Sequence, residues 1–98
     1  MVELVLPYLE DIDEGVRLQA VEALLRHQQE ASSKLPMLRA LVRPEEESLR
    51  LKRRIAEGIA VLGWAVAGFP EEPGEALTRA LPEGVAIDKA GKLARKGA

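Results

Sequence analysis

The chain has 98 residues, of which 47% are hydrophobic and 31% are charged, and its formal net charge is −2. This length supports one domain with a modest core. A charge balance so close to neutral provides no overall field that would hold nucleic acid or an acidic membrane surface. The absence of cysteine excludes disulfides, a thiol nucleophile and cysteine metal ligands.

No apolar run reaches membrane-spanning length, and the acidic N-terminal region is unlike a signal peptide. We therefore expect a cytoplasmic protein with no membrane partner. Only 3% of the residues are aromatic, and an aliphatic core favours packed helices over a β-sandwich. The lack of asparagine together with abundant charge is typical of proteins from thermophiles.

The first two helices are expected over about residues 2–10 and 14–28. Pro7 lies near the start of the first helix, and Asp13 is a suitable N-cap for the second. Apolar residues at spacings of three and four lie on two sides of the second helix. This pattern predicts packed neighbours on both sides.

Two more helices follow. Ser32 or Ser33 is expected to cap the third, which places Pro36 in its first turn, where a missing N–H costs little. The fourth is expected to cover about residues 46–65. Gly58, inside this helix, indicates the close approach of a neighbouring backbone.

The remaining residues are expected to form a C-terminal cap over residues 67–98. Residues 75–81 could form two helical turns before Pro82. Two short runs around Asp88 and Gly91 predict a small β-hairpin over residues 85–95. We expect this segment to fold back, together with Trp64 and Phe69, and to close the core.

The chain contains an internal repeat. Residues 16–25 align with residues 51–60 in their apolar, basic, acidic and small positions, at an offset of 35 (51 minus 16). A shorter helix and an acidic turn are expected before each of these segments. The repeat therefore predicts two stacked helix–turn–helix units.

The first unit resembles the HEAT repeat, in which an acid in the turn between two helices precedes the pattern Val-Arg-x-x-Ala-x-x-x-Leu. The matching residues are Asp11, Val16, Arg17, Ala20 and Leu24, and a looser copy contains Glu46, Leu51, Lys52, Ile55 and Ile59. Residues 55–95 also resemble the C-terminal end of bacterial HEAT-repeat proteins.

This resemblance implies an all-α fold in a single domain: a short α-solenoid of two HEAT-like helical hairpins, residues 1–29 and 30–66, followed by the cap. It also implies a structural ladder between neighbouring units, in which acids of the turns pair with the bases that follow them. The residues of this ladder would be Asp11 with Arg17, or Glu46 with Lys52. The second helix of each unit would line a concave surface.

The side chains present do not support catalysis. His27 is the only histidine and lies at helical spacing after Leu24, as a residue at the boundary of a packed helix would. The serines are explained by capping. Glu45, Glu46 and Glu47 are adjacent and would splay apart on a helix rather than converge on a metal. We therefore predict no enzyme activity, no metal and no cofactor.

The predicted function is a protein–protein interaction scaffold whose partner is not identified. Arg26, Arg50 and Arg54 are the candidate contacts on the concave surface. Leu6 and Leu9 are candidates on an N-terminal face that no upstream helix covers, where a homodimer could form.

Nucleic-acid binding is the less favoured alternative. Residues 50–54 and residues 89–96 are rich in lysine and arginine and could contact phosphates. Glu45, Glu46, Glu47 and Glu57 lie near the first basic cluster and could pair with it. Aromatic residues that could stack on bases are scarce.

Overall fold

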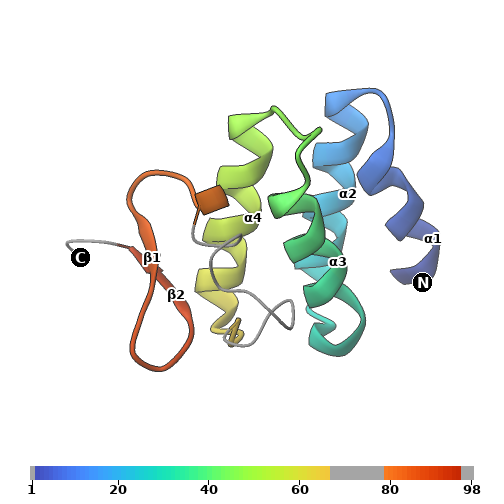
Figure 1. The fold of residues 1–98 in the computed structure, drawn as a ribbon. Coiled ribbons are helices and arrows are strands. Elements are labelled where there is room, and N and C mark those ends of the chain that lie inside the picture. The colour runs from blue at the N-terminus through green and yellow to red at the C-terminus, as the bar shows by residue number, and fades with distance from the viewer. Residues whose placement is uncertain (1, 67–78, 96–98) are drawn as a thin grey trace.

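A computed structural model describes residues 2–66 and 79–95 of the chain. The described part is mostly helical, with one small antiparallel sheet (Figure 1). In chain order the elements are α1 (Val2–Val5), the 3-10 helix η1 (Leu6–Glu10), α2 (Glu14–His27), α3 (Glu30–Val42), α4 (Leu49–Leu62), β1 (Val85–Ile87) and β2 (Leu93–Arg95).

The first two predicted helices are confirmed, with one difference. The first divides into α1 and η1, because Pro7 in the first turn of η1 has no N–H for the helical ladder. α2 begins where the sequence indicates: the Asp13 carboxylate accepts hydrogen bonds from the N–H groups of Gly15 at 2.7 Å and Val16 at 3.3 Å. It ends at Gln28, which has a left-handed backbone with φ 54°.

The prediction that a serine caps the third helix is wrong. α3 begins at Glu30, so Pro36 lies in its interior and not in its first turn. The earlier start is stabilised by Lys34, whose Nζ lies 3.0 Å from the Glu30 carboxylate and 2.8 Å from the Ala65 carbonyl oxygen. Ser33 is fully buried in α3, and its hydroxyl has no hydrogen-bond partner.

The fourth helix is shorter than expected at both ends. Ser48 is its N-cap and accepts a hydrogen bond from the Leu51 N–H at 3.1 Å. Gly63 ends the helix with φ 73°, a conformation that glycine adopts at little cost. Glu46, expected in the first turn, instead lies outside α4 and is only 2% exposed.

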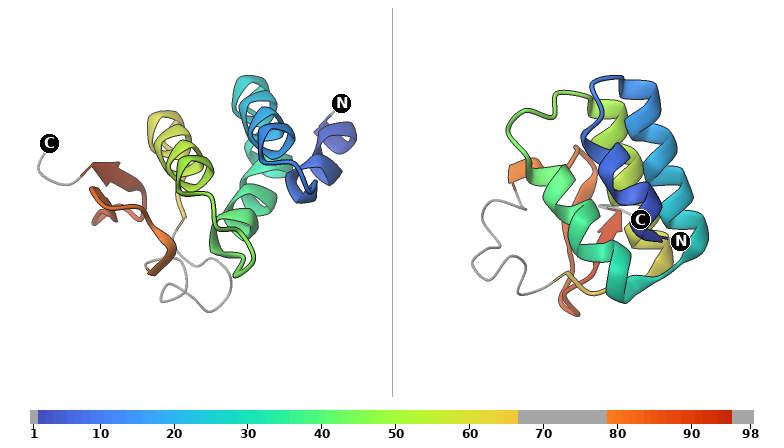
Figure 2. Two further views of the ribbon diagram at one scale, coloured as in Figure 1. Left: turned by 90° about the horizontal axis from the view of Figure 1, so that it is seen from above. Right: turned by 90° about the vertical axis from the view of Figure 1, so that its right-hand side faces the viewer.

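The helices form two antiparallel pairs that lie side by side. The first pair is η1 with α2, and the second pair is α3 with α4. α2 and α4 pack together in one layer, and η1 and α3 pack together in the other (Figure 2, left). The core lies between the layers, and its fully buried side chains include Val21, Leu24, Met37, Leu38, Leu41, Leu51, Ile55 and Ile59.

Gly58 allows α2 and α4 to approach closely. A Cβ atom at this position would lie 2.5 Å from a methyl carbon of Leu25 in α2. The sequence correctly indicates a close neighbour here, but that neighbour is a side chain and not a backbone segment.

The predicted β-hairpin is confirmed, with Val85 opposite Arg95 and Ile87 opposite Leu93. The Asp88 carboxylate accepts hydrogen bonds from the N–H groups of Ala90 at 2.9 Å and Lys92 at 3.0 Å, and so stabilises the turn.

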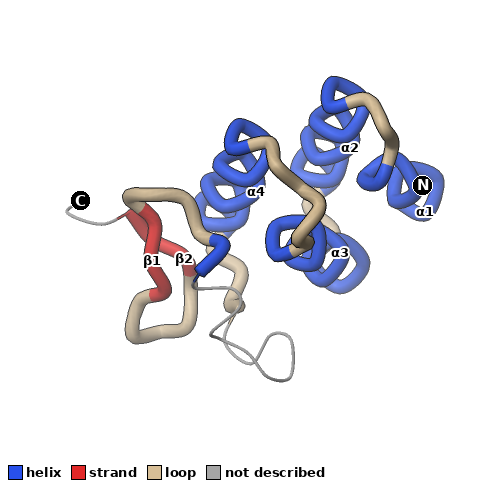
Figure 3. The backbone as a smooth tube through the Cα atoms, turned by 45° about the horizontal axis from the view of Figure 1, so that its top comes forward, coloured by secondary structure: helices blue, strands red, loops and turns tan. Residues whose placement is uncertain are grey.

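The hairpin packs against the side of α4 that faces away from α2 (Figure 3). Trp64 and Leu93 are buried there, at 8% and 3% exposure. Phe69 and most of the helical turns expected over residues 75–81 lie outside the described residues; residues 79 and 80 are helical.

Candidate functional site

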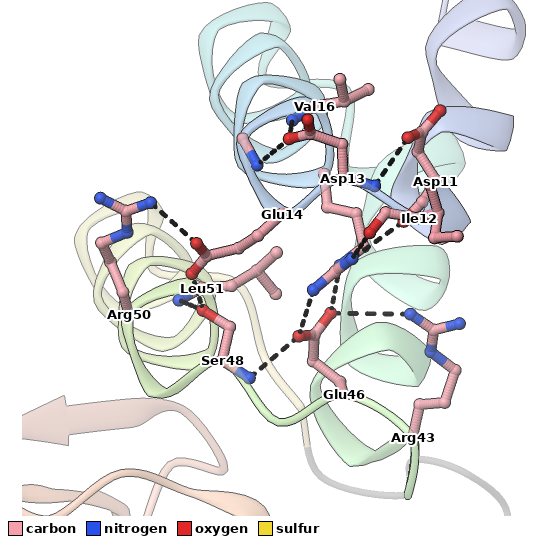
Figure 4. Close-up of polar contacts among 12 residues, drawn as sticks. Asp11, Ile12, Asp13, Glu14, Val16, Arg43, Glu46, Ser48, Arg50 and Leu51 are labelled. Atoms are coloured by element: carbon pink, nitrogen blue, oxygen red, sulfur yellow. Dashed lines mark hydrogen bonds and ion pairs between the residues drawn. The ribbon is translucent and has the colours of Figure 1, made fainter.

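The most buried charged contact in the described part of the chain joins the two helical pairs. Nε of Arg17 lies 2.8 Å from Oε1 of Glu46, and a terminal nitrogen lies 3.1 Å from Oε2. Figure 4 shows the Glu46 carboxylate with Ser48 and Arg43 on either side of it. The other terminal nitrogen donates to the carbonyl oxygens of Asp11 at 2.9 Å and Ile12 at 3.2 Å. Arg17 therefore connects the turn before α2 with the turn before α4.

The environment of Glu46 favours its charged form. Burial opposes the charge, but hydrogen bonds from Arg17 and from the Ser48 N–H outweigh burial and lower the pKa of Glu46. The Ser48 N–H lies 3.0 Å from Oε2. Glu46 is therefore a structural acid that receives the Arg17 side chain of the preceding helical pair.

Arg43 is less well satisfied than Arg17. Its terminal nitrogen lies 3.6 Å from Oε1 of Glu46, which is longer than a hydrogen bond. Its Nε is buried and has no hydrogen-bond partner. Glu46 therefore accepts close hydrogen bonds from Arg17 and Ser48 and makes only a loose ionic contact with Arg43.

Two of the predicted contact residues instead join α2 to α4. Arg50 lies 3.0 Å from the Glu14 carboxylate, which also accepts a hydrogen bond from the Ser48 hydroxyl. Arg54 forms a bidentate pair with Glu22. The hydrogen bond from Ser48 lowers the pKa of Glu14, and the one from Arg54 lowers the pKa of Glu22. The acids that form ion pairs with Arg50 and Arg54 therefore come from α2, and the expected neighbour Glu57 adds only a weaker attraction to Arg54.

The N-terminal face differs from the one expected. Leu9 is buried at 5% exposure, and Leu6 packs against the core as a half-buried side chain. The exposed apolar side chains of this region are instead Leu4 at 70%, Tyr8 at 53% and Ile12 at 97%. The prediction that Leu6 and Leu9 lie on an uncovered face is therefore wrong. The burial of Leu9 depends on where α3 lies, which the local pattern does not show.

The remaining predicted contact and the only histidine both lie near the end of α2. Arg26 and His27 are exposed in the last turn of this helix. Within residues 2–66 and 79–95, no three His, Cys, Asp or Glu side chains group as a metal site would require. No helix in this part of the chain is long and apolar enough to cross a membrane.

A cleft of about 210 Å³ lies between η1 and α3. Its apolar lining comes from Leu6, Leu9, Pro36 and Ala40, and its polar lining from Glu10, Arg39 and Arg43. Both arginines of this cleft belong to residues 31–43, which contain three bases and no acid.

A second cleft, of about 340 Å³, lies between α4 and the hairpin. Arg54 and Glu57 provide its charges, and Ala60, Val61, Val85 and Ala94 provide its apolar lining. Val61 is 85% exposed.

Comparison of the chain with protein-family models, curated proteins and solved structures finds no match. The HEAT resemblance therefore rests on the residues of the repeat alone.

Proposed function

We propose that the chain is a non-catalytic protein–protein interaction module, a short α-solenoid of two HEAT-like helical pairs with a β-hairpin cap. Exposed apolar side chains at the N-terminal edge carry this proposal. Leu4 and Tyr8 are 70% and 53% exposed on the segment that lies farthest from the hairpin (Figures 1 and 2). Large apolar side chains that are exposed together at one edge favour a contact with another protein.

The packing of the two helical pairs supports the solenoid part of the proposal. Arg17 of the first pair binds the turn acid of the second, Glu46, at the position that a ladder between repeats requires. In repeat proteins each unit buries its faces against its neighbours, and an end unit without a polar outer face tends to associate. The hairpin covers one end here, whereas Leu4 and Tyr8 are exposed at the other.

The test is a capture experiment from a lysate of the source organism. The wild-type chain is compared with the double variant L4E/Y8E and with V61E, which places a charge at another exposed apolar position, on α4. We expect the same proteins to be recovered by wild type and V61E, with or without nuclease, and to be lost with L4E/Y8E. Recovery of identical proteins by all three chains would contradict the proposal.

A second copy of the chain is one partner to test. Light scattering on the purified protein measures the mass of the particle and so detects a dimer directly. A dimer that L4E/Y8E converts to a monomer, and that V61E leaves intact, would assign the N-terminal edge to self-association.

Nucleic-acid binding remains the less favoured alternative. Arg50 and Arg54 already bind carboxylates of α2, which reduces the positive field at residues 50–54. Lys89 and Lys92 are exposed in the hairpin. Nucleic acid that co-purifies and is released steeply as salt rises would favour this alternative over a protein partner.

A further inference from the structure

We propose that the cleft between η1 and α3 binds an acidic segment of a protein partner, with one apolar side chain inserted in the cleft and a carboxylate bound to Arg43. This inference rests on the proposed function, since both require a protein partner. It adds the chemical class of that partner and a second place of contact.

The shape and lining of the cleft suit a single apolar side chain. Its volume is about 210 Å³, and Leu6 and Leu9 from η1 face Pro36 and Ala40 from α3 across it. An inserted side chain would be surrounded by apolar groups from two elements. Such a pocket provides the buried anchor on which a protein interface depends.

The charge around the cleft selects an acidic partner. Arg39 and Arg43 line it against one acid, Glu10. Arg39 is exposed, and neither Arg39 nor Glu10 forms an ion pair within the described part of the chain. An acidic segment would meet this local excess of positive charge, whereas a basic one would be repelled.

Arg43 offers a specific binding point for the carboxylate. Among the residues that the structure describes, its buried Nε donor has no partner, and its one ionic contact, with Glu46, is 3.6 Å long. Glu46 is shared, since both of its carboxylate oxygens accept hydrogen bonds from Arg17 while Arg43 approaches only Oε1. A small rotation of the loosely held guanidinium would present Nε and a terminal nitrogen together to an incoming carboxylate, the bidentate geometry that arginine favours.

The second cleft lacks this combination. In the cleft between α4 and the hairpin, Arg54 lies beside Glu57 and is already bound to Glu22. That cleft therefore has no charge preference that would define a partner.

The proposal is tested with short fluorescent peptides and anisotropy measurements. The first probe is a glutamate-rich peptide with one central leucine. A second replaces the leucine by alanine, and a third replaces the glutamates by lysines. We expect the first probe to bind at least about tenfold more tightly than either of the others, because each control removes one of the two interactions.

Three variants locate the binding site. R39E is compared with R53E, which makes the same charge change at an exposed arginine of α4. R43K keeps the positive charge but removes the Nε donor. We expect R43K to weaken binding of the first probe by about tenfold, the effect of losing one charge-assisted hydrogen bond. R39E should weaken it by about tenfold or more because it reverses a charge at the cleft, and R53E should leave it unchanged. Circular dichroism confirms that each variant is folded.

Several results would overturn the proposal: no binding of the first probe, equal binding of the acidic and basic probes, or equal losses in R39E and R53E. Unchanged binding by R43K would overturn the role of Nε. These failures are distinct from failure of the proposed function, because the lysate capture depends on Leu4 and Tyr8, which do not line the cleft. Capture that L4E/Y8E abolishes, together with no binding of the first probe, would overturn the cleft alone.

Discussion

Arg17 and Glu46, 29 residues apart in the sequence, form a bidentate ion pair between the two helical pairs, with Nε and Oε1 2.8 Å apart. The Glu46 side chain is completely buried, and that of Arg17 is 15% exposed. A pair in such surroundings contributes little net stability as a pair but becomes costly when one partner is removed.

Replacing Arg17 by methionine should therefore lower the free energy of unfolding by about 3–5 kcal/mol, because the Glu46 carboxylate would stay buried without its counter-charge. The double variant R17M/E46L should recover most of that loss. Urea denaturation provides the measurement, and R53A, at an exposed site, should stay within about 0.5 kcal/mol of wild type. A double variant that is less stable than R17M alone would contradict this account.

Acid should destabilise the protein through Glu46, Glu14 and Glu22. All three have folded-state pKa values lowered from the ordinary value of 4.5. The folded protein therefore holds these protons more weakly than the unfolded chain does. The resulting stability is fully present above about pH 4.5 and is lost as the pH falls through the lowered folded-state pKa values.

Urea denaturation at a series of pH values measures this loss. R17M/E46L should show a smaller decrease between neutral and acidic pH than wild type, because it lacks the Glu46 contribution. The contributions of Glu14 and Glu22 should remain in the variant. Identical pH profiles for the two proteins would show that Glu46 is not perturbed.

Gly58 should not tolerate alanine. The added methyl would lie 2.5 Å from a methyl carbon of Leu25, so α2 and α4 would have to move apart or Leu25 would have to change rotamer. We expect a destabilisation of about 1–3 kcal/mol, the usual cost of overpacking a core. A double-mutant cycle with L25A should give a combined loss well below the sum of the single losses. Additive losses would show that Leu25 is not the obstruction.

Replacement by aspartate should affect the stability of the protein strongly at Leu9 and only slightly at Leu4. L9D places a charge at a site that is 5% exposed and should cost more than about 3 kcal/mol, a large share of the stability of a domain of this size. L4D changes a side chain that is 70% exposed and should alter stability by less than about 0.5 kcal/mol. Thermal melts followed by circular dichroism compare the two, and equal melting temperatures would contradict the burial described for Leu9.

The sequence predicted the elements whose signals are local. Asp13 and the apolar periodicity define α2, and Asp88 and Gly91 define the hairpin turn. The start of α3 was missed because Ser32 and Ser33 precede Pro36 as a helix cap would, whereas the helix begins at Glu30, and its residue Lys34 binds the distant Ala65 carbonyl. That contact depends on the tertiary fold and leaves no signal in the local pattern.

The candidate site was predicted only in part. A structural role for Arg17 was expected, but its acid was sought within one unit, as Asp11, while the structure provides Glu46 from the other. Arg50 and Arg54 were expected on a partner surface, which stays a prediction, while their ion pairs with Glu14 and Glu22 of α2 were not foreseen. The clefts could not be predicted, because their lining combines elements whose relative placement the sequence does not specify.

The contacts between α2 and α4 have a mechanical consequence. Glu14 binds Ser48 and Arg50 near the start of α2, and Glu22 binds Arg54 eight residues later, a rise of about 12 Å along the helix. Two contacts at different positions along the helices oppose rotation of one helical pair against the other, which a single contact would permit. Because η1 packs on α2 and α3 packs on α4, the spacing of α2 and α4 also affects the width of the cleft between η1 and α3. Loss of the ion pair between Glu22 and Arg54 should therefore change the width of a cleft that neither residue lines.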